Sequence, residues 1–267
     1  MSYVLLPFEY LFDYTFGFIF KGFFWVLAKI LPTNYITVLT KYSDLFVRGI
    51  RTTLGIALFG TIFGLIVAVL LASLRTANVS KKSSKVKRMF VYIGHKIIDI
   101  YVTIFRGTPM MVQAMIIYYG LVGIVHFSPV TAGLIIVSIN TCAYLTEVMR
   151  KGIESVSTGQ KEAAKALGFT SFKTLVFIIL PQALKNQMAS IGNEFVINIK
   201  DTSVLNVIGC AEMYFVLKTS ASSDYTFMET MLVGAVIYLI LTLSVTKILS
   251  AIDKKLGSPK VELLSSN

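Results

Sequence analysis

Charged residues are scarce in this sequence. Asp, Glu, Lys and Arg make up 15% of the 267 residues, whereas hydrophobic residues make up 55%, and the mean hydropathy is +0.73. A soluble domain of this length carries charge on about a quarter of its residues. The composition therefore excludes an ordinary soluble domain and indicates a protein embedded in a membrane.

Residues that bind metals or form disulfides are also few. The two cysteines, Cys142 and Cys210, lie far apart, and the two histidines, His95 and His126, are isolated. Their spacing fits neither a disulfide framework nor a metal site. The sequence also lacks the Gly-x-x-x-x-Gly-Lys-Ser/Thr phosphate loop, so ATP would have to bind to a different chain. We therefore expect no catalytic residue, metal ion or bound cofactor.

Long uncharged runs predict membrane-spanning helices. About 20 apolar residues of helix are enough to cross the hydrocarbon core of a bilayer, and the first strong run, residues 52–74, contains no charge at all. A second run, residues 107–146, is long enough for two spans that turn near residues 126–129. A further span is predicted at residues 230–246. Residues 174–199 are also apolar, but they are interrupted by Pro181, Lys185 and Glu194.

The N-terminal region allows two interpretations. Residues 14–31 are aromatic and apolar but contain Lys21 and Lys29. They form either an extra span or a helix in the membrane interface, where aromatic and basic residues are both favoured. Five spans would place the N-terminus outside the cell, and six would place it in the cytoplasm.

Positive charge is concentrated in a few segments. The net charge is +11, but the basic residues cluster along the sequence, and this clustering argues against a nucleic-acid-binding surface. Basic residues mark cytoplasmic loops of membrane proteins, so we expect these segments in the cytoplasm and no nucleic-acid partner. The three segments contain Arg75, Lys81, Lys82, Lys85, Lys87, Arg88 and Lys96, then Arg150, Lys151, Lys161, Lys165 and Lys173, then Lys254, Lys255 and Lys260.

A short polar helix is predicted at about residues 158–168. Ser157 and Gln160 fit a capping box, Glu162 suits the positive end of the helix dipole, and Gly168 suits a left-handed C-terminal position. A helix of about ten residues is unstable alone in water, so its flat face must be buried against something. That partner is either another protein, which makes the helix a docking element, or the chain's own membrane domain. The face contains Ala163, Ala164, Ala166 and Leu167.

Several residues inside or beside the apolar runs are candidates for packing or for a transport path. Gly60 and Gly64 form a small-xxx-small pattern that lets helices approach closely. Arg106 precedes a helix break at Gly107-Thr108-Pro109 and is either an interfacial anchor or a specific contact. Polar residues in spans are functional candidates by default, although packing or ion pairing would also explain them. Those of a substrate path are Glu147, Asn193, Glu194, Lys200, Asp201 and Ser203.

These motifs together resemble the membrane-embedded permease subunits of ATP-binding-cassette importers of polar amino acids (the histidine, glutamine, arginine and cystine type). The resemblance covers about residues 44–250. It rests on Glu162-Ala163-Ala164 with Gly168 and Leu180-Pro181, on Arg106-Gly107-Thr108-Pro109 with Val112-Gln113, and on Glu147 to Ile153, Gly159-Gln160, Pro181-Gln182-Ala183, Gly192 to Phe195, Lys200 to Ser203 and Ile208-Gly209.

The resemblance implies an all-α membrane protein with a five-helix importer-permease core and an extra N-terminal hydrophobic helix, giving five or six spans. The implied divisions are an N-terminal segment (1–43), a permease domain (44–252) and a cytoplasmic tail (253–267). The short helix becomes a coupling helix that sits in a cleft of a partner ATPase, through Gly159, Gln160, Glu162, Ala163, Ala164, Leu167 and Gly168.

The same resemblance implies the partners and the location. Arg106, Gly107, Pro109 and Pro181 carry the permease motif, and the bacterial plasma membrane is the location. ATPase subunits would consume ATP, an external binding protein would deliver the amino acid, and a second permease chain would complete the pore. A self-sufficient channel or ion-coupled carrier is the alternative, and it predicts internal repeats with matching broken helices. Which amino acid is carried, and whether the pore is a homodimer, stays open.

Overall fold

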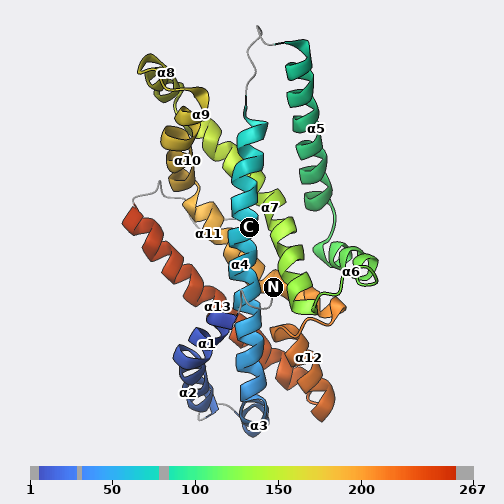
Figure 1. The fold of residues 1–267 in the computed structure, drawn as a ribbon. Coiled ribbons are helices and arrows are strands. Elements are labelled where there is room, and N and C mark those ends of the chain that lie inside the picture. The colour runs from blue at the N-terminus through green and yellow to red at the C-terminus, as the bar shows by residue number, and fades with distance from the viewer. Residues whose placement is uncertain (1–5, 29–31, 78–83, 257–267) are drawn as a thin grey trace. The chain divides into compact units, whose positions relative to one another are not determined.

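The computed structural model describes residues 6–28, 32–77 and 84–256, which form helices and no strand. The predicted all-α class is confirmed. Predicted features at residues 29–31, at Lys81 and Lys82 and in the tail from residue 257 lie outside the described residues. The elements, most of them labelled in Figure 1, are α1 (Leu6–Thr15), α2 (Gly17–Ala28), α3 (Thr33–Lys41), α4 (Ser43–Arg75), α5 (Lys85–Gly107), α6 (Met110–Leu121), α7 (Pro129–Ser155), α8 (Thr158–Ala166), α9 (Ser171–Thr174), the π-helix η2 (Leu175–Ile179), α10 (Leu180–Asn186), α11 (Met188–Asp201), the 3₁₀-helix η3 (Thr202–Ile208), α12 (Met213–Asp224) and α13 (Phe227–Leu256).

The chain forms two compact units, each assembled from three separate segments. The first combines Met1–Gly60, Met110–Val137 and Val196–Val245, and the second combines Thr61–Pro109, Ser138–Phe195 and Thr246–Asn267. The four helices α4, α7, α11 and α13 contribute residues to both units. The order of residues along the chain therefore does not separate the two units.

Within the described residues, three helices are long and apolar enough to cross a membrane: Thr33–Arg75, Pro129–Ser155 and Phe227–Lys255. The pair α5 and α6 adds a fourth if the two are counted as one bent span. The predicted spans at residues 52–74 and 230–246 are thus confirmed as parts of α4 and α13. Apolar side chains such as Ile66 and Leu239, each 56% exposed, suit contact with lipid.

The prediction of two spans within residues 107–146 is wrong for the first of them. Of that run, α6 takes twelve residues, or about 18 Å of helix, which is too short for a bilayer core of about 30 Å. If α5 and α6 are one bent span, α5 supplies the rest of the passage, and the two helices meet at 109°. The second span and the turn near residue 126 are where the sequence predicts them.

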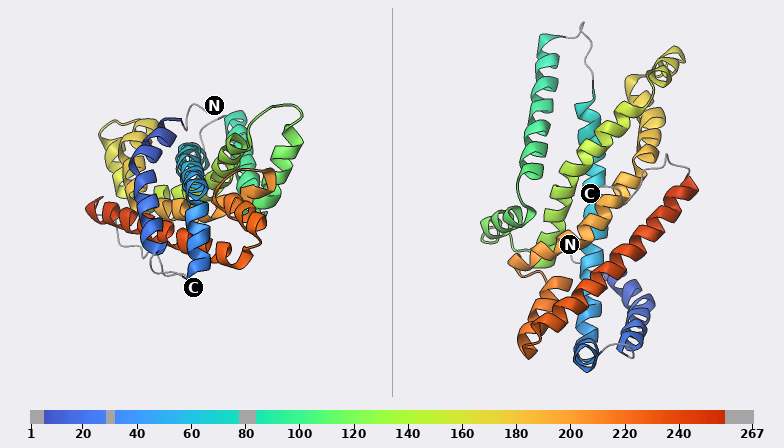
Figure 2. Two further views of the ribbon diagram at one scale, coloured as in Figure 1. Left: turned by 90° about the horizontal axis from the view of Figure 1, so that it is seen from below. Right: turned by 180° about the vertical axis from the view of Figure 1, so that it is seen from behind.

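The predicted N-terminal hydrophobic helix is present, but it is broken at Phe16 into α1 and α2. Two ion pairs connect it to α4: Arg51 with Asp13 and Lys21 with Asp44, each at 2.6 Å. Figure 2 shows α1 to α3 beside the first half of α4 from behind as well, in agreement with Figure 1. Of the two lysines that made this segment ambiguous, Lys21 is therefore paired with Asp44 of the first unit, and Lys29 lies outside the described residues.

Each unit has its own buried apolar cluster. In the first, Ile56, Ile136 and Leu205 are almost completely buried at the centre of the cluster. In the second, Leu145 and Met149 occupy that position. Because both clusters include residues of α4 or α7 as well as of later helices, burial of apolar surface holds elements together that are distant in sequence.

The interrupted apolar region of residues 174–199 is helical, with two irregular points. Pro181 has no N–H to donate to the carbonyl four residues earlier, and the π-helical turn η2 ends two residues before it. The side chain of Gln182 donates to the carbonyl of Ile178 at 2.7 Å. A further break at Gln187 separates α10 from α11. The predicted interruption is thus confirmed at the proline.

Candidate functional site

The short helix α8 presents most of its surface to solvent. Its nine residues contact α9 and η2 within the second unit. Ala164 is 1% exposed, whereas Leu167 is 77% exposed. The remaining residues predicted for coupling are exposed as well: Gly159, Gln160, Glu162, Ala163 and Gly168. Of the flat face only Ala164 is buried among the described residues, so the alternative that this face packs on the chain's own membrane domain accounts for one alanine and leaves the rest exposed.

Gly168 ends α8 in a left-handed conformation, as the sequence predicts. Its φ is +81°. The N–H of Gly168 donates to the carbonyl of Lys165 at 3.0 Å, and the N–H of Phe169 donates to the carbonyl of Ala164 at 3.0 Å. This pair of bonds is the Schellman motif, which satisfies the carbonyls at a helix end. The glycine fixes the direction in which the chain leaves α8 for α9.

The predicted N-terminal cap of α8 is wrong in detail. Ser157 occupies the N-cap position, but its hydroxyl makes no capping hydrogen bond. Instead, the N–H of Gln160 donates to the backbone carbonyl of Ser157 at 3.1 Å, which leaves that donor unavailable to a side chain. Glu162 is the fifth helical residue and lies in the second turn, so it is not in the first turn as predicted.

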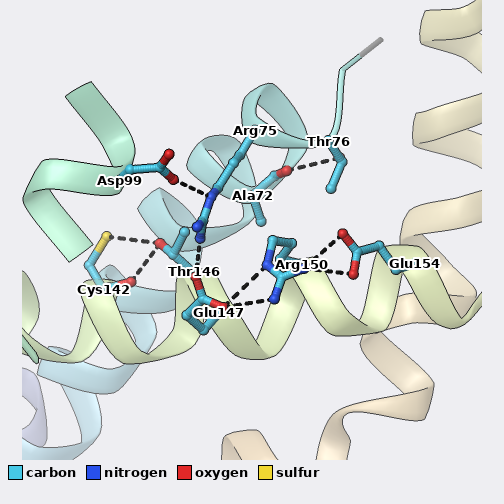
Figure 3. Close-up of polar contacts among 9 residues, drawn as sticks. All are labelled: Ala72, Arg75, Thr76, Asp99, Cys142, Thr146, Glu147, Arg150 and Glu154. Carbon is cyan, nitrogen blue, oxygen red and sulfur yellow. Dashed lines mark hydrogen bonds and ion pairs between the residues drawn. The ribbon is translucent and has the colours of Figure 1, made fainter. Parts of the chain in front are cut away.

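Five charged side chains gather in the second unit beside the chain segment that leads into α8 (Figure 3). Arg75, in the last turn of α4, bonds Asp99 of α5 at 2.8 Å and also bonds Glu147 of α7. Glu147 is bound in addition by Arg150 at 3.0 Å, and Arg150 bonds Glu154 at 2.7 Å. Three helices are therefore connected by one chain of alternating charges.

Glu147 is engaged within this cluster. Its side chain is 15% exposed and its two carboxylate oxygens bond Arg75 and Arg150 separately. A carboxylate already holding two guanidinium groups has little capacity left for the ammonium of an amino acid. Glu147 was predicted as a candidate for the substrate path, but the geometry favours an ion-pairing role for it.

The other predicted path residues lie along α11 and at the start of η3. Asn193, Lys200 and Asp201 are exposed, and Glu194 and Ser203 are partly buried. Asn193 and Glu194 belong to the second unit, and the remaining three belong to the first. Helical residues at this spacing share a face of α11, so a polar strip on that helix is compatible with the structure.

Arg106 lies at the corner between α5 and α6. Its guanidinium carbon is 5.3 Å from the centre of the Tyr144 ring, which is within cation–π range. Gly107 ends α5, and Pro109 precedes α6. The Arg-Gly-Thr-Pro motif thus lies at the 109° bend between α5 and α6, and the arginine contacts an aromatic ring of α7.

Glu212 is a buried acid that the sequence analysis missed. It lies just before α12, outside the membrane-spanning helices, and is 0% exposed. Its carboxylate accepts hydrogen bonds from the N–H groups of Tyr214 and Phe215, each at 2.8 Å, and from the hydroxyl of Tyr238 at 3.3 Å. Glu212 is the N-cap residue of α12, but Glu is not among the residues preferred at that position, so the sequence carries no clear signal for this role.

We expect Glu212 to make stability fall as pH rises from about 4.5 to about 7. Burial raises the pKa of its carboxyl to about 7, against the opposing effect of its hydrogen bonds. The groups around it are Cys210, Thr53 and Tyr238, and no cation of the described residues shifts its pKa. Between its ordinary pKa of 4.5 and 7, the folded protein holds a proton that the unfolded chain releases. The free energy of unfolding therefore decreases over that window, by about 1.4 kcal/mol for each pH unit.

The measurement is the midpoint of thermal unfolding at pH 5 to 8 in detergent or nanodiscs. Glu212→Gln is expected to flatten this component of the pH dependence, whereas Glu229→Gln, which alters a partly buried acid in the first turn of α13, is expected to leave it intact. A Glu212→Gln protein with an unchanged pH profile would contradict the assignment.

Comparison with known proteins gives a consistent result. The sequence matches the family described as "Binding-protein-dependent transport system inner membrane component" over residues 86–258. It is 33% identical over 213 residues to the arginine transport system permease protein ArtQ of Bacillus subtilis (strain 168), covering 79% of this chain and 92% of that protein. It is 31% identical over 215 residues to the glutamine transport system permease protein GlnP of Escherichia coli (strain K12), covering 79% and 93%.

Solved structures show the same likeness. A structure described as "Crystal structure of an amino acid ABC transporter with histidines" is similar with a TM-score of 0.71 and 29% identity, covering 84% of this chain and all of that one. An inward-facing structure of the MetNI methionine ABC transporter has a TM-score of 0.69 at 16% identity, covering 81% and 98%. The second likeness concerns the fold alone.

Proposed function

Because this chain belongs to the family of binding-protein-dependent transport system inner membrane components, we propose that it is the permease subunit of an ATP-driven importer of amino acids. The observation that carries the proposal is the exposed helix α8, in a chain whose long helices suit a membrane. Relatives named for arginine and glutamine transport support amino acids as the substrate class. The bacterial plasma membrane is the corresponding location.

The partner of α8 is proposed to be an ATP-binding subunit. A nine-residue helix that buries one alanine and leaves Leu167 exposed gains little stability from its own chain,. A cleft in a partner would cover Leu167, Ala163 and Glu162. ATP would then be bound and hydrolysed by that partner, and this chain would change conformation without making or breaking covalent bonds.

The transport path is proposed to include the polar residues of α11 and η3. Asn193, Glu194, Lys200, Asp201 and Ser203 supply both signs of charge and a hydroxyl. An amino acid presents an ammonium and a carboxylate, so such a strip can interact with both ends. An external binding protein would deliver the substrate, and a second permease chain would complete the path. Arg106, Gly107, Pro109 and Pro181 would shape the helix corners of the permease.

The test is uptake of radiolabelled arginine, glutamine, histidine and cystine by cells with and without this chain. We expect chain-dependent uptake to stop when arsenate depletes ATP, and two ATP-binding subunits to copurify with the tagged chain. Uptake that survives arsenate but collapses with a protonophore would overturn the proposal and favour the ion-coupled carrier. Absence of a copurifying ATPase would also count against it.

A further inference from the structure

Two stretches of the second unit connect directly to α8. Its N-terminal end follows α7 after two residues, and its C-terminal end leads through Gly168 into α9 and α10. The end of α7 packs closely on α10, because a Cβ at Gly152 would lie 3.1 Å from the carbonyl oxygen of Ala183. Asn186 of α10 also donates to the hydroxyl of Ser155 at 3.3 Å. A displacement of α8 therefore acts on α7 and α10 together.

The helices α4 and α5 have no such covalent connection to α8. Arg75 of α4 forms ion pairs with Glu147 of α7 and with Asp99 of α5 (Figure 3), so its guanidinium links the three helices. The ring Nε2 of His95 on α5 lies 2.9 Å from the carbonyl of Leu74, so it donates there and adds a second link between α5 and the last turn of α4. The last turn of α4 and the adjoining part of α5 are thus linked to each other and, through Arg75, to α7. Elsewhere in the unit, the hydroxyl of Tyr101 on α5 donates to the carbonyl of Ile139 on α7 at 2.6 Å, and α4 packs on α7 at Gly64.

We propose that Arg75 is the positioning residue that makes α4 and α5 move with α7 when the ATP-binding partner moves α8. This inference rests on the proposed function. A guanidinium suits the task because its planar fork can hold two carboxylates in fixed directions, which a lysine ammonium cannot do. The side chains of Arg75 and Glu147 are 22% and 15% exposed and that of Asp99 is 39% exposed, so water competes less for the Arg75–Glu147 bond than for the Arg75–Asp99 ion pair.

The charge pattern supports a mechanical connection rather than a substrate site. Every acidic group of the cluster is ion-paired: Asp99 and Glu147 with Arg75, and Glu147 and Glu154 with Arg150. Arg75 also donates a hydrogen bond to Glu147, whereas Oδ1 of Asp99 makes no hydrogen bond, so the cluster fixes α4 against α7 more firmly than against α5,. Loss of Arg75 is expected to leave α7 responsive to α8, while the last turn of α4 and the adjoining part of α5 follow it less closely.

The experiment compares Arg75→Gln, Arg75→Lys, Glu147→Gln and the double variant Arg75→Gln/Glu147→Gln in the whole transporter in proteoliposomes. We expect amino acid transported per ATP hydrolysed to fall fivefold or more in each, with the ATP-binding subunits still copurifying. Glu154→Gln is the matched control, since Glu154 lies on the same helix and bonds Arg150 without contacting Arg75. Its ratio is expected to stay within twofold of the unaltered protein.

The outcomes separate this inference from the proposed function. A purely structural role would lower transport and ATP hydrolysis in parallel and leave their ratio unchanged, and the double variant, which removes both buried charges, would then regain normal transport. Either result overturns the inference. If the unaltered complex itself shows no ATP-driven uptake, the proposed function fails instead.

Discussion

Gly168→Val is expected to reduce ATP-driven uptake at least tenfold. Gly168 has φ of +81°, and no atom outside its own neighbourhood lies within 4 Å of an added Cβ. The effect would thus come from backbone conformation, because a left-handed residue other than glycine costs about 1–2 kcal/mol and a β-branched side chain is worse placed still. The two hydrogen bonds that close α8 would be lost, and the exposed face of a nine-residue helix would no longer point toward the partner.

Gly168→Asn is the matched control for this variant. Asparagine tolerates the left-handed region better than other non-glycine residues, so we expect most of the uptake to remain. Uptake is measured with the amount of folded permease in the membrane held equal. A valine variant that transports as well as the asparagine variant would contradict the role assigned to α8.

Gly64→Leu is expected to prevent accumulation of folded protein, and Gly64→Ala to lower the free energy of unfolding by about 1–3 kcal/mol. An added Cβ at Gly64 would lie 3.0 Å from the carbonyl oxygen of Ser138 and 3.1 Å from the amide nitrogen of Cys142. These are backbone atoms of α7, so the two helices would have to separate. The close approach is the one that the Gly60 and Gly64 pattern predicts.

Gly94 provides the control, because it lies in α5 and nothing lies within 4 Å of an added Cβ there. Gly94→Ala is expected to be neutral or to stabilise the protein by up to about 1 kcal/mol, since alanine favours helix over glycine. The readouts are the thermal unfolding midpoint and the monodisperse fraction in size-exclusion chromatography. Equal behaviour of Gly64→Ala and Gly94→Ala would refute the tight α4–α7 contact.

The parts of the protein that were predictable are those whose cause is local. A long uncharged apolar run is unfavourable in water, and such runs at residues 52–74 and 230–246 let the sequence alone predict α4 and α13 as spans,. Gly168 is recognisable because few other residues adopt its backbone conformation. The spacing of two glycines on one helix face predicts a close helix contact without naming the partner helix.

The parts that were mispredicted depend on partners distant in sequence or on competing bonds. A polar residue in a span has the same local pattern whether it meets a substrate or a cation, and only the fold brings Arg75 to Glu147, 72 residues away. In the same way, the N–H of Met213 donates to Thr53 at a separation of 160 residues. The sequence predicts the helix break at Gly107-Thr108-Pro109, but not the 109° angle between the two helices, because hydropathy measures apolar length and carries no information on direction.

By itself, then, the sequence determined the class of the protein, its main spans, the short helix α8 and the glycine that ends it, because each follows from the solvation or backbone needs of neighbouring residues. The tertiary structure decided which face of α8 stays exposed, that Glu147 is bound by two arginines, and that Glu212 is buried at the start of α12. These features depend on which helices pack together, and packing is a property of the whole fold rather than of any local stretch.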